Sequence, residues 1–375
     1  MATWTGGGEE GRVRARGRGG AGVGGLLASL FLASCAAVPR ESVILVTLDG
    51  VRWQEVFEGA EERLLSKQEG GVHDVAGLRS AFWRESAEAR REVLFPFVWG
   101  TLAREGQVLG NARKGTPMRV TNGHSFSYPG YAEMLCGFAD ARVDSNKKVP
   151  NPNATVLEWL SHRPGFEGQV AAFCTWDVFL SILNRDRCGF FVHMGPPVTP
   201  ESPEGRRRLL EDLYGDVPPL FGGVVLDALE FHAGLDYVRA RKPRVFYLAL
   251  GETDEWAHEG RYDLYLQAAH RGDDFVRRLW ETVQAMPEYR GRTSLIVTTD
   301  HGRGDAPAEW KSHGAKVKGA EFVWAAMIGP GVASRGERHD TEGLTQSQIA
   351  STLAGLVGED FRAEHPQAAG ALPLK

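Results

Sequence analysis

The chain has 375 residues, of which 42% are hydrophobic and 24% are charged. This composition is that of a globular protein and excludes disordered and fibrous classes. The net charge of −5 leaves no excess of basic residues of the kind that binds nucleic acid. The length allows two or three domains, or one large α/β domain with an extensive core.

The N-terminus has the pattern of an export signal. Four arginines among glycines precede an apolar run over Ala21–Leu32, which is too short to span a bilayer. The run ends in Leu32-Ala33-Ser34-Cys35, which resembles a bacterial lipobox, where the cysteine becomes the lipidated first residue. We therefore expect a signal peptide over residues 1–34, a short tether over 35–42, and a lipid anchor on Cys35 in the bacterial periplasm or outer membrane. An ordinary cleaved signal with an incidental cysteine is the alternative.

Export would place the remaining cysteines, Cys136, Cys174 and Cys188, in an oxidising compartment. Their odd number allows at most one internal disulfide. Cys174 and Cys188 are the nearer pair in sequence, but spacing alone does not establish the geometry of a bond. The absence of a Cys-x-x-Cys motif argues against a zinc site made of thiolates.

Apolar runs alternate with helical patterns along the rest of the chain. The runs are short, rich in Val, Ile, Phe and Ala, and lack polar alternation, which is typical of parallel strands covered on both faces. The predicted strands are Val43–Leu48, Gln169–Phe173, Phe190–His193, Arg244–Leu250, Ser294–Thr299 and Phe322–Ile328. The predicted helices are Glu92–Glu105, Gly130–Cys136, Thr155–His162, Gly222–Arg239, Tyr262–Met286 and Thr345–Leu356.

This alternation predicts an α/β fold, with a mostly parallel central sheet and helices on both faces. We expect residues 43–375 to form a single catalytic domain. Residues 53–90 are charged and irregular, which indicates an insertion with short helices. Residues 194–219 are rich in proline and glycine and predict a long surface loop.

Several of the predicted strands run directly into residues that can bind metals or protons. Asp49-Gly50 follows the first strand, Asp254 and His258 follow the fourth, and Asp300-His301-Gly302 follows the fifth, with His313 soon after. In a parallel α/β sheet, functional groups gather beyond the carboxyl ends of the strands. The sequence therefore predicts that these side chains meet at one edge.

The spacing of these residues is compatible with a metal site. Asp254 and His258 share a face if their segment is one helical turn, and Gly302 permits the bend that would let Asp300 and His301 converge. Carboxylate and imidazole together suit Zn²⁺ and similar ions. A single Asp-Gly after a strand is usually a turn, so the joint pattern carries the prediction.

A further segment supplies a candidate nucleophile. Pro129 fits the first turn of a helix, so that Ser127 would lie just before its N-terminus. The unpaired N–H groups and the dipole at that end favour an anion such as a transferring phosphoryl group. The simpler alternative is that Ser127 only caps the helix.

Taken together, these motifs resemble the alkaline phosphatase superfamily, particularly its type I phosphodiesterase/nucleotide pyrophosphatase branch. The resemblance spans about residues 43–358. One departure is Trp256-Ala257, where glycine is common. The matching residues are Asp49, Ser127-Tyr128-Pro129 through Gly137, Asp254 and His258, Asp300-His301-Gly302, and His313.

The resemblance implies two divalent metal ions, with Zn²⁺ favoured and Mn²⁺ as the alternative. One ion would be held by Asp254, His258 and His313. The other would be held by Asp49, Asp300, His301 and the oxygen of Ser127. Two such ions can stabilise both the attacking and the leaving oxygen of an in-line displacement.

The activity implied is hydrolysis of phosphoric esters through a phosphoseryl intermediate on Ser127, with a phosphodiesterase or nucleotide pyrophosphatase as the main expectation. Asn146 lies near the position at which that branch places an asparagine that contacts a phosphate oxygen, although a turn-forming asparagine is the alternative. The expected partners are a small-molecule phosphate ester and, through the lipid anchor only, the membrane. A phosphomonoesterase of the same superfamily is the first alternative.

Three other functions remain to be weighed. Sulfatases share the fold but convert a residue within a Cys/Ser-x-Pro-x-Arg motif, and here Tyr131 occupies the arginine position. Cofactor-independent phosphoglycerate mutases share the metal layout, but they are cytosolic and carry a large inserted domain. A non-catalytic surface lipoprotein is disfavoured because every expected ligand position is intact.

Overall fold

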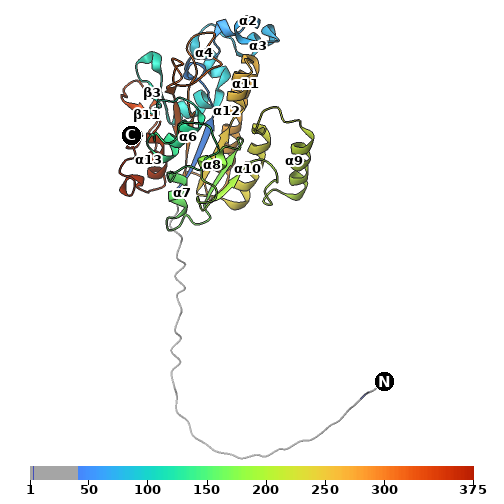
Figure 1. Cartoon of the computed structure of the whole chain (residues 1–375), viewed down its shortest axis with the longest axis vertical. Helices are drawn as coiled ribbons and strands as arrows, with labels where there is room; N and C mark the ends of the chain where they lie inside the picture. Colours follow the sequence, from blue (N-terminus) through green and yellow to red (C-terminus); the bar gives the residue numbers. More distant parts are fainter. Residues whose placement is uncertain (1–2, 4–40) are drawn as a thin grey trace, which may run out of the picture. The chain divides into compact units, whose positions relative to one another are not determined.

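The computed structural model describes Thr3 and residues 41–375 (Figure 1). The predicted signal peptide apart from Thr3, the anchor residue Cys35 and most of the tether lie outside these residues. Residues 41–375 fall within one compact unit. Among the helices of the described residues, none combines the length and the apolarity needed to cross a bilayer.

An eight-stranded, mostly parallel sheet forms the centre of the fold. Its strands are β1 (Ser42–Leu48), β2 (Gln107–Leu109), β4 (Val170–Cys174), β5 (Phe191–His193), β6 (Val245–Leu250), β7 (Thr293–Thr298), β9 (Ala325–Ile328) and β10 (Gly336–Glu337). They lie in the order β10-β2-β9-β7-β1-β6-β4-β5. The prediction of a mostly parallel sheet in an α/β fold is confirmed.

The register of the central strands aligns their carboxyl ends. β1 pairs in parallel with β6 on one side and β7 on the other. Leu48 lies opposite Leu250, and Thr47 lies opposite Thr298. The residues that follow these three strands therefore emerge at the same edge of the sheet.

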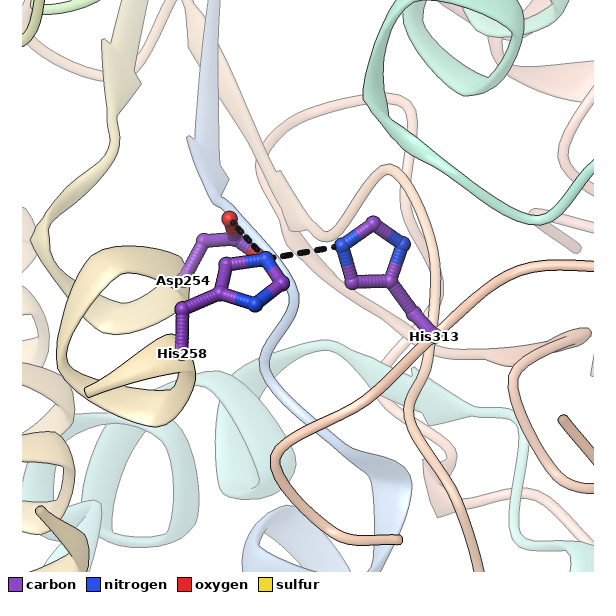
Figure 2. A group of neighbouring side chains, drawn as sticks. All are labelled: Asp254, His258 and His313. Atoms are coloured by element: carbon purple, nitrogen blue, oxygen red, sulfur yellow. Dashed lines mark hydrogen bonds and ion pairs between the residues drawn. The ribbon is translucent and has the colours of Figure 1, made fainter. Parts of the chain in front are cut away.

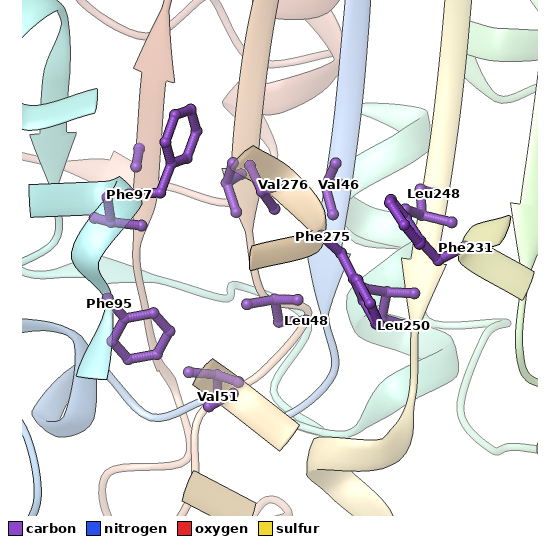
Figure 3. Close-up of a cluster of buried hydrophobic side chains, with 14 of the residues drawn as sticks. Val46, Leu48, Val51, Phe95, Phe97, Phe231, Leu248, Leu250, Phe275 and Val276 are labelled. Carbon is purple, nitrogen blue, oxygen red and sulfur yellow. The ribbon is translucent and has the colours of Figure 1, made fainter. Parts of the chain in front are cut away.

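Both faces of this sheet are covered by apolar packing. Along β1, Ile44, Val46 and Leu48 belong to one hydrophobic core and Val43 and Leu45 to the other, because successive side chains point to opposite faces. This explains why the strand sequence shows no polar alternation. Figure 3 shows part of the first core, with Val46 and Leu48 of β1 beside Leu248 and Leu250 of β6.

Helices supply the other side of each core. Those packed into the first core are α1 (Trp53–Glu58), α3 (Val75–Phe82), α4 (Ala87–Leu94), α10 (Asp227–Arg241) and α12 (Tyr262–Ala285). Those packed into the second are α6 (Ser127–Cys136), α7 (Val156–Ser161), α8 (Phe179–Ile182) and α13 (Gln348–Leu356). The remaining helices are α2 (Lys67–Gly70), α5 (Ala103–Glu105), α9 (Glu204–Asp216) and α11 (Glu252–His258). Short 3₁₀ or π turns are η1 (Glu62–Leu64), η2 (Val98–Leu102), η3 (Ala112–Lys114) and η4 (Phe361–Ala363).

The predicted strand Phe322–Ile328 is wrong in two respects. Phe322–Val323 forms β8, which belongs to a separate three-stranded sheet with β3 (Met118–Arg119) and β11 (Leu344–Thr345). Ala325–Ile328 forms β9, which runs antiparallel to β7. Trp324 separates the two strands and is fully buried, with its indole N–H donated to the carbonyl oxygen of Val51 at 3.0 Å. A continuous apolar run carries no signal for such a change of sheet.

The predicted helix Glu92–Glu105 is also broken. It divides into the end of α4, the π turn η2 and the short α5, because the side chain of Asp273 accepts the backbone N–H groups of Phe97 and Val98 at 2.7 and 2.9 Å. These two N–H groups are thereby withdrawn from a regular helical ladder. Residues 53–90 hold short helices, as expected.

The surface loop predicted over residues 194–219 contains α9, a helix of 13 residues. α9 fully buries only Leu210, with Leu213 and Tyr214 partly buried against the first core, and this short apolar stripe lies within a mostly charged sequence. In Figure 1 α9 lies beside α10, and Arg206 forms an ion pair with Asp236 of α10 at 2.9 Å. The three described cysteines, Cys136, Cys174 and Cys188, are buried and free.

A buried carboxylate holds the segment that leads to α9. Glu230 of α10 lies 2.6 Å from the Nδ1 atom of His193, and it accepts the backbone N–H of Gly195 at 3.2 Å. The hydroxyl group of Tyr214 in α9 donates to its second oxygen at 3.0 Å. Because Glu230 is fully buried, water could not replace it as the hydrogen-bond acceptor for these three partners.

Glu230→Ala should therefore lower the free energy of unfolding by about 3 kcal/mol, because it leaves buried donors without an acceptor. Cleavage by a protease within residues 194–219 should accelerate as the segment detaches. Chemical denaturation and limited proteolysis measure the two effects. Glu204→Ala, which removes an exposed ion pair with Arg208, is the control and should change little. Equal stability of the two variants would contradict this role of Glu230.

Candidate active site

The edge at which β1, β6 and β7 end carries the predicted metal-binding residues. Asp49 directly follows β1, and its backbone oxygen accepts the hydroxyl group of Thr253 at 2.5 Å. Gly50 has a φ of +61°, a conformation that glycine adopts readily. Its N–H donates to Oδ1 of Asp300 at 3.0 Å, which ties the end of β1 to the end of β7.

Asp49, Asp300 and His301 form the first ligand group, with one potential ligand atom from each lying within 4.8 Å of the others. The Nε2 atom of His301 lies 3.4 Å from Oδ1 of Asp49 and 3.4 Å from Oδ2 of Asp300. Both of these carboxylate oxygens are buried without a hydrogen-bond partner. Buried oxygens in this state are costly unless a cation or a proton completes them.

The protonation of this group follows from its burial. Burial raises the pKa of Asp49 and of Asp300 well above the usual range. The charge of Asp254 raises both pKa values further, and that of Asp49 also raises the pKa of Asp300. Nδ1 of His301 lies 2.8 Å from the carbonyl oxygen of Gly302, which can only accept, so this nitrogen carries the proton. The lone pair of Nε2 therefore faces the two carboxylates, as a metal ligand requires.

Asp254, His258 and His313 form the second group (Figure 2). Asp254 and His258 lie one turn apart in α11, as the spacing predicted, and Oδ2 of Asp254 is 3.1 Å from Nε2 of His258. The Nε2 atoms of His258 and His313 are 2.9 Å apart. Figure 2 shows the two rings approaching each other from α11 and from the loop that carries His313.

Electrostatics keep this second group in the state that binds a cation. Burial, together with the neighbouring His301, lowers the pKa of His313 to about 2, so its ring is neutral. Burial opposes the ionised form of Asp254, but Arg303 and the two histidines outweigh it and hold the pKa of this carboxyl well below its usual range. The group therefore presents an ionised carboxylate at Asp254 and a neutral imidazole at His313.

Ser127 lies beside the first group. It is 5% exposed, and its Oγ atom is 3.3 Å from Nε2 of His301. The structure corrects its place in the helix, because Ser127 is the first residue of α6 and Phe126 is the capping residue. A Cβ atom on Gly130 would approach the carbonyl oxygen of Asp300 to 2.4 Å, so glycine allows α6 to lie directly against the ligand loop.

The loop before Ser127 is held by Glu133, a buried residue of α6. Glu133 accepts the backbone N–H groups of Thr121 and Asn122 at 2.8 and 2.9 Å and the hydroxyl group of Ser347 at 2.7 Å. Asn122 in turn accepts the N–H groups of the two residues before Phe126. This network fixes the approach of the chain to Ser127.

Asn146 reaches the same end of α6. Its Oδ1 atom accepts the backbone N–H of Tyr128 at 2.9 Å, and its side chain lines the same cleft as Ser127. Within the part of the chain described, no hydrogen bond of its Nδ2 group is found. The amide is therefore oriented with its donor atoms available to a ligand.

A cleft of about 190 Å³ opens over both groups. Its walls include residues outside the predicted set, among them Trp176, Val224 and Glu255. Burial and the nearby Asp254 raise the pKa of Glu255 to about 7. The lining residues are Asp49, Ser127, Asn146, Trp176, Val224, Gly251, Asp254, Glu255, His258 and His313.

Comparison with known proteins identifies the architecture. No protein-family model matches the chain, and no curated protein matches its sequence. A protein in the alkaline phosphatase superfamily from Vibrio parahaemolyticus is 14% identical, with a TM-score of 0.50 over 86% of this chain and 67% of that one. A variant of the alkaline phosphatase PafA is 10% identical, with a TM-score of 0.54 over 90% of this chain and 99% of that one. The chain has the fold of the alkaline phosphatase superfamily.

The fold alone does not distinguish the branches of the superfamily. A putative sulfatase from Bacteroides thetaiotaomicron VPI-5482 is 12% identical to this chain, with a TM-score of 0.54 over 89% of this chain and 74% of that one. A phosphatase and a sulfatase thus match this alkaline phosphatase-like chain about equally well. Its substrate has to be argued from the residues of its own site.

This edge of the sheet includes a further residue that the sequence analysis missed. Arg303 is fully buried and forms an ion pair with Asp254. It also donates to the backbone oxygens of Gly50 and Lys311 at 3.2 and 2.8 Å, so it connects the segments that carry the ligands. The only signal in the sequence is its place three residues after Asp300, which does not separate it from a surface arginine.

The donor set of this candidate site fits divalent cations. Each group offers carboxylate oxygen and imidazole nitrogen, the preferred ligands of Zn²⁺ and similar ions. Asp49 and Asp300 each have a buried oxygen without a hydrogen-bond partner, and His301 presents a lone pair to both. A bound cation would satisfy all three acceptors, which cannot satisfy one another. Two groups of three ligands are therefore ready to bind metal.

The raised pKa values predict how the metal-free protein responds to pH. An unfolded aspartate loses its proton near 3.8, whereas Asp49 and Asp300 in the folded protein keep theirs to higher pH. At these two groups the folded state therefore binds more protons in this window, so their contribution to stability falls as pH rises from about 4 through the raised pKa values, whereas the lowered pKa of His313 acts in the opposite direction below about 6.5.

Thermal denaturation of chelator-treated protein from pH 4 to 8 measures this dependence. Asp300→Asn, which cannot titrate, should show a smaller fall in Tm across that range. Added Zn²⁺ should raise Tm at pH 7 in the native chain and raise it less in the variant. An identical pH profile in the two proteins would contradict the assignment of these carboxyl groups.

Proposed function

We propose that this protein is a metal-dependent hydrolase of phosphoric esters in which Ser127 is the nucleophile. The observation that carries the proposal is the position of Ser127. Its Oγ atom lies 3.3 Å from His301 of the first ligand group, at the N-terminus of α6 and in the wall of a cleft that also exposes the second group. A hydroxyl group placed in this way can attack phosphorus and be relieved of its proton without a separate base.

Asp49, Asp300, His301 and the Ser127 oxygen would hold one metal ion, and Asp254, His258 and His313 would hold the other. Zn²⁺ suits these ligands best, and Mn²⁺ is the alternative. When bound, the two ions would lower the pKa of the nucleophile and neutralise charge on the attacking and leaving oxygens.

The residues of the chain divide the rest of the reaction between them. The amide of Asn146 donates to a phosphate oxygen, and the N-terminus of α6 favours the anion beside Ser127. The bond from Oγ to phosphorus forms as the bond from phosphorus to the leaving alcohol breaks, and the alcohol leaves with a proton. Water then cleaves the phosphoseryl bond, which releases the phosphate product and restores the hydroxyl group.

The lining of the cleft supports a phosphodiester as the substrate. A monoester dianion carries an extra charge, which a dedicated arginine or a third cation would have to meet. Among the described residues that line the cleft there is no lysine or arginine. Asn146, the proposed hydrogen-bond donor to the phosphate, is neutral. The single charge of a phosphodiester, including that of a nucleotide-type anhydride, matches this lining.

A sulfatase is the second candidate, because a putative sulfatase shares the fold. The residue at the position of the sulfatase arginine argues against it. Tyr131 occupies that position, is 1% exposed, and donates its hydroxyl group to Oδ2 of Asp49 at 2.9 Å. The side chain is committed to orienting a candidate ligand, and the motif for conversion of Ser127 is absent.

Ser127→Ala tests the nucleophile. Turnover of an aryl phosphodiester should fall by about 1,000-fold or more, because the hydroxyl group is consumed covalently. Metal content and Tm should stay close to those of the native chain. Rapid acid quenching followed by mass spectrometry should find phosphate on Ser127 of the native protein. Turnover by the alanine variant at the native rate would refute the proposal.

The preference for diesters is a separate prediction. With bis(4-nitrophenyl) phosphate and 4-nitrophenyl phosphate at equal metal loading, kcat/KM should favour the diester by at least about tenfold. A 4-nitrophenyl sulfate ester serves as the third substrate. A higher value for the monoester would move the protein to the phosphatase side, and a higher value for the sulfate ester would support the sulfatase candidate.

We also propose that the protein is exported and lipid-anchored at Cys35. The support is the signal-like pattern of residues 1–34 and the lipobox-like tetrapeptide that ends at Cys35. Mass spectrometry of the protein from membranes should find a mature chain that begins with lipidated Cys35. Cys35→Ala should release the chain from the membrane fraction, and a mature N-terminus elsewhere would contradict the anchor.

A further inference from the structure

One acidic side chain in the cleft has no role in the reaction described above. Glu255 lies in α11 between the ligands Asp254 and His258, it is half-buried, and it lines the cleft. Across the described residues, no hydrogen bond or ion pair engages its carboxyl group. A carboxyl group kept in a cleft without a partner is suited to bind part of a ligand.

The wall that accompanies Glu255 is built by two segments far apart in the sequence. Trp176 follows β4, and Val224 belongs to the segment that returns from α9. The two residues form a β-bridge. Hydrogen bonds on either side reinforce it, from the N–H of Asp177 to Gly223 and from the N–H of Val225 to Thr175, both at 2.9 Å. The cleft thus has an indole and an aliphatic side chain in fixed positions.

The charges near this wall favour a cation. Asp177, the residue after Trp176, is paired with Lys148 at 2.6 Å. The lining itself combines a carboxyl group with an aromatic ring, and both attract a positive charge. An anionic leaving group would instead be repelled by the Glu255 carboxylate, because no lysine or arginine among the described lining residues would balance its charge.

The size of the cleft limits the group that can bind. Its volume of about 190 Å³ has to hold the phosphoryl group as well as the leaving alcohol. Pockets for drug-sized ligands are larger, from about 300 Å³ upward. A small alcohol therefore fits the space beside Glu255, whereas a nucleoside would have to extend out of the open cleft.

We infer that Glu255 is a specificity-determining residue that selects phosphodiesters whose leaving alcohol carries an ammonium group. The ammonium would lie between the Glu255 carboxylate and the face of Trp176, while the ester oxygen faces Asp254, His258 and His313. The inference rests on the proposed function, since it assigns the leaving-group side of the same site.

Three methyl phosphodiesters test the inference, with choline, its uncharged isostere 3,3-dimethylbutanol, and glycerol as the second alcohol. Release of each alcohol by the metal-loaded protein is followed by proton NMR, which gives three kcat/KM values. The native protein should prefer the choline ester. Intrinsic differences in reactivity cancel when the choline-to-dimethylbutanol ratio is compared between variants.

Glu255→Gln should lower that ratio by about tenfold, the effect of losing one half-buried charge pair. Glu259→Gln is the matched control, because it removes the same charge from an exposed residue four positions further along, outside the cleft. The control should keep the native ratio. A ratio that Glu255→Gln leaves unchanged, or a native preference for the dimethylbutanol or glycerol ester, would overturn the inference.

Equilibrium binding separates this inference from the proposed function. In the metal-loaded Ser127→Ala background, calorimetry should find the choline ester bound more tightly than its isostere, and adding Glu255→Gln should remove the difference. If the native protein binds with this preference but hydrolyses none of the esters, the subsite stands and the proposed hydrolase does not. If it hydrolyses the esters without this preference, the proposed hydrolase activity is supported and the proposed role of Glu255 is wrong.

Discussion

The convergence of three carboxylates at one edge of a parallel sheet is the constraint on which the rest of the site depends. Asp49, Asp254 and Asp300 repel one another, and two of them have buried oxygens without a partner. A chain would not keep such an arrangement for stability, because apolar residues would fill the space at lower cost. The ion pair between Arg303 and Asp254 and the hydrogen bond from Tyr131 to Asp49 offset part of this free-energy cost. By our proposal, bound metal ions offset the rest.

Much of the fold could be predicted, because its central strands are buried on both faces. β1 and β6 read as uninterrupted apolar runs for this reason, and the residues after them could be placed at one edge from the rule for parallel sheets. The same property concealed the direction of β9, since an antiparallel strand with two buried faces has the same composition. α9 was missed because its short apolar stripe, Leu210, Leu213 and Tyr214, lies in a mostly charged segment that is flanked by prolines and glycines.

The convergence of the candidate ligands could be predicted because each of them sits in a motif with its own local geometry. Asp254 and His258 needed only a helical turn, and Asp300 and His301 needed only a bend. Residues that complete the site through long-range contacts gave no such signal. Arg303, Glu133 and Val224 are ordinary residue types in the sequence, and their roles arise only when distant segments pack together.

The bridge between Trp176 and Val224 has a consequence for how this chain could change its chemistry over time. The candidate metal ligands follow the central strands. Val224, in contrast, belongs to a long connection that leaves the sheet after β5, includes α9 and then returns to the cleft. Insertions, deletions or exchange of that connection would remodel the mouth of the cleft while the ligand loops keep their own supports. A descendant of this protein could thus acquire a new substrate by exchanging this one surface segment, while the candidate metal-binding residues stay unchanged.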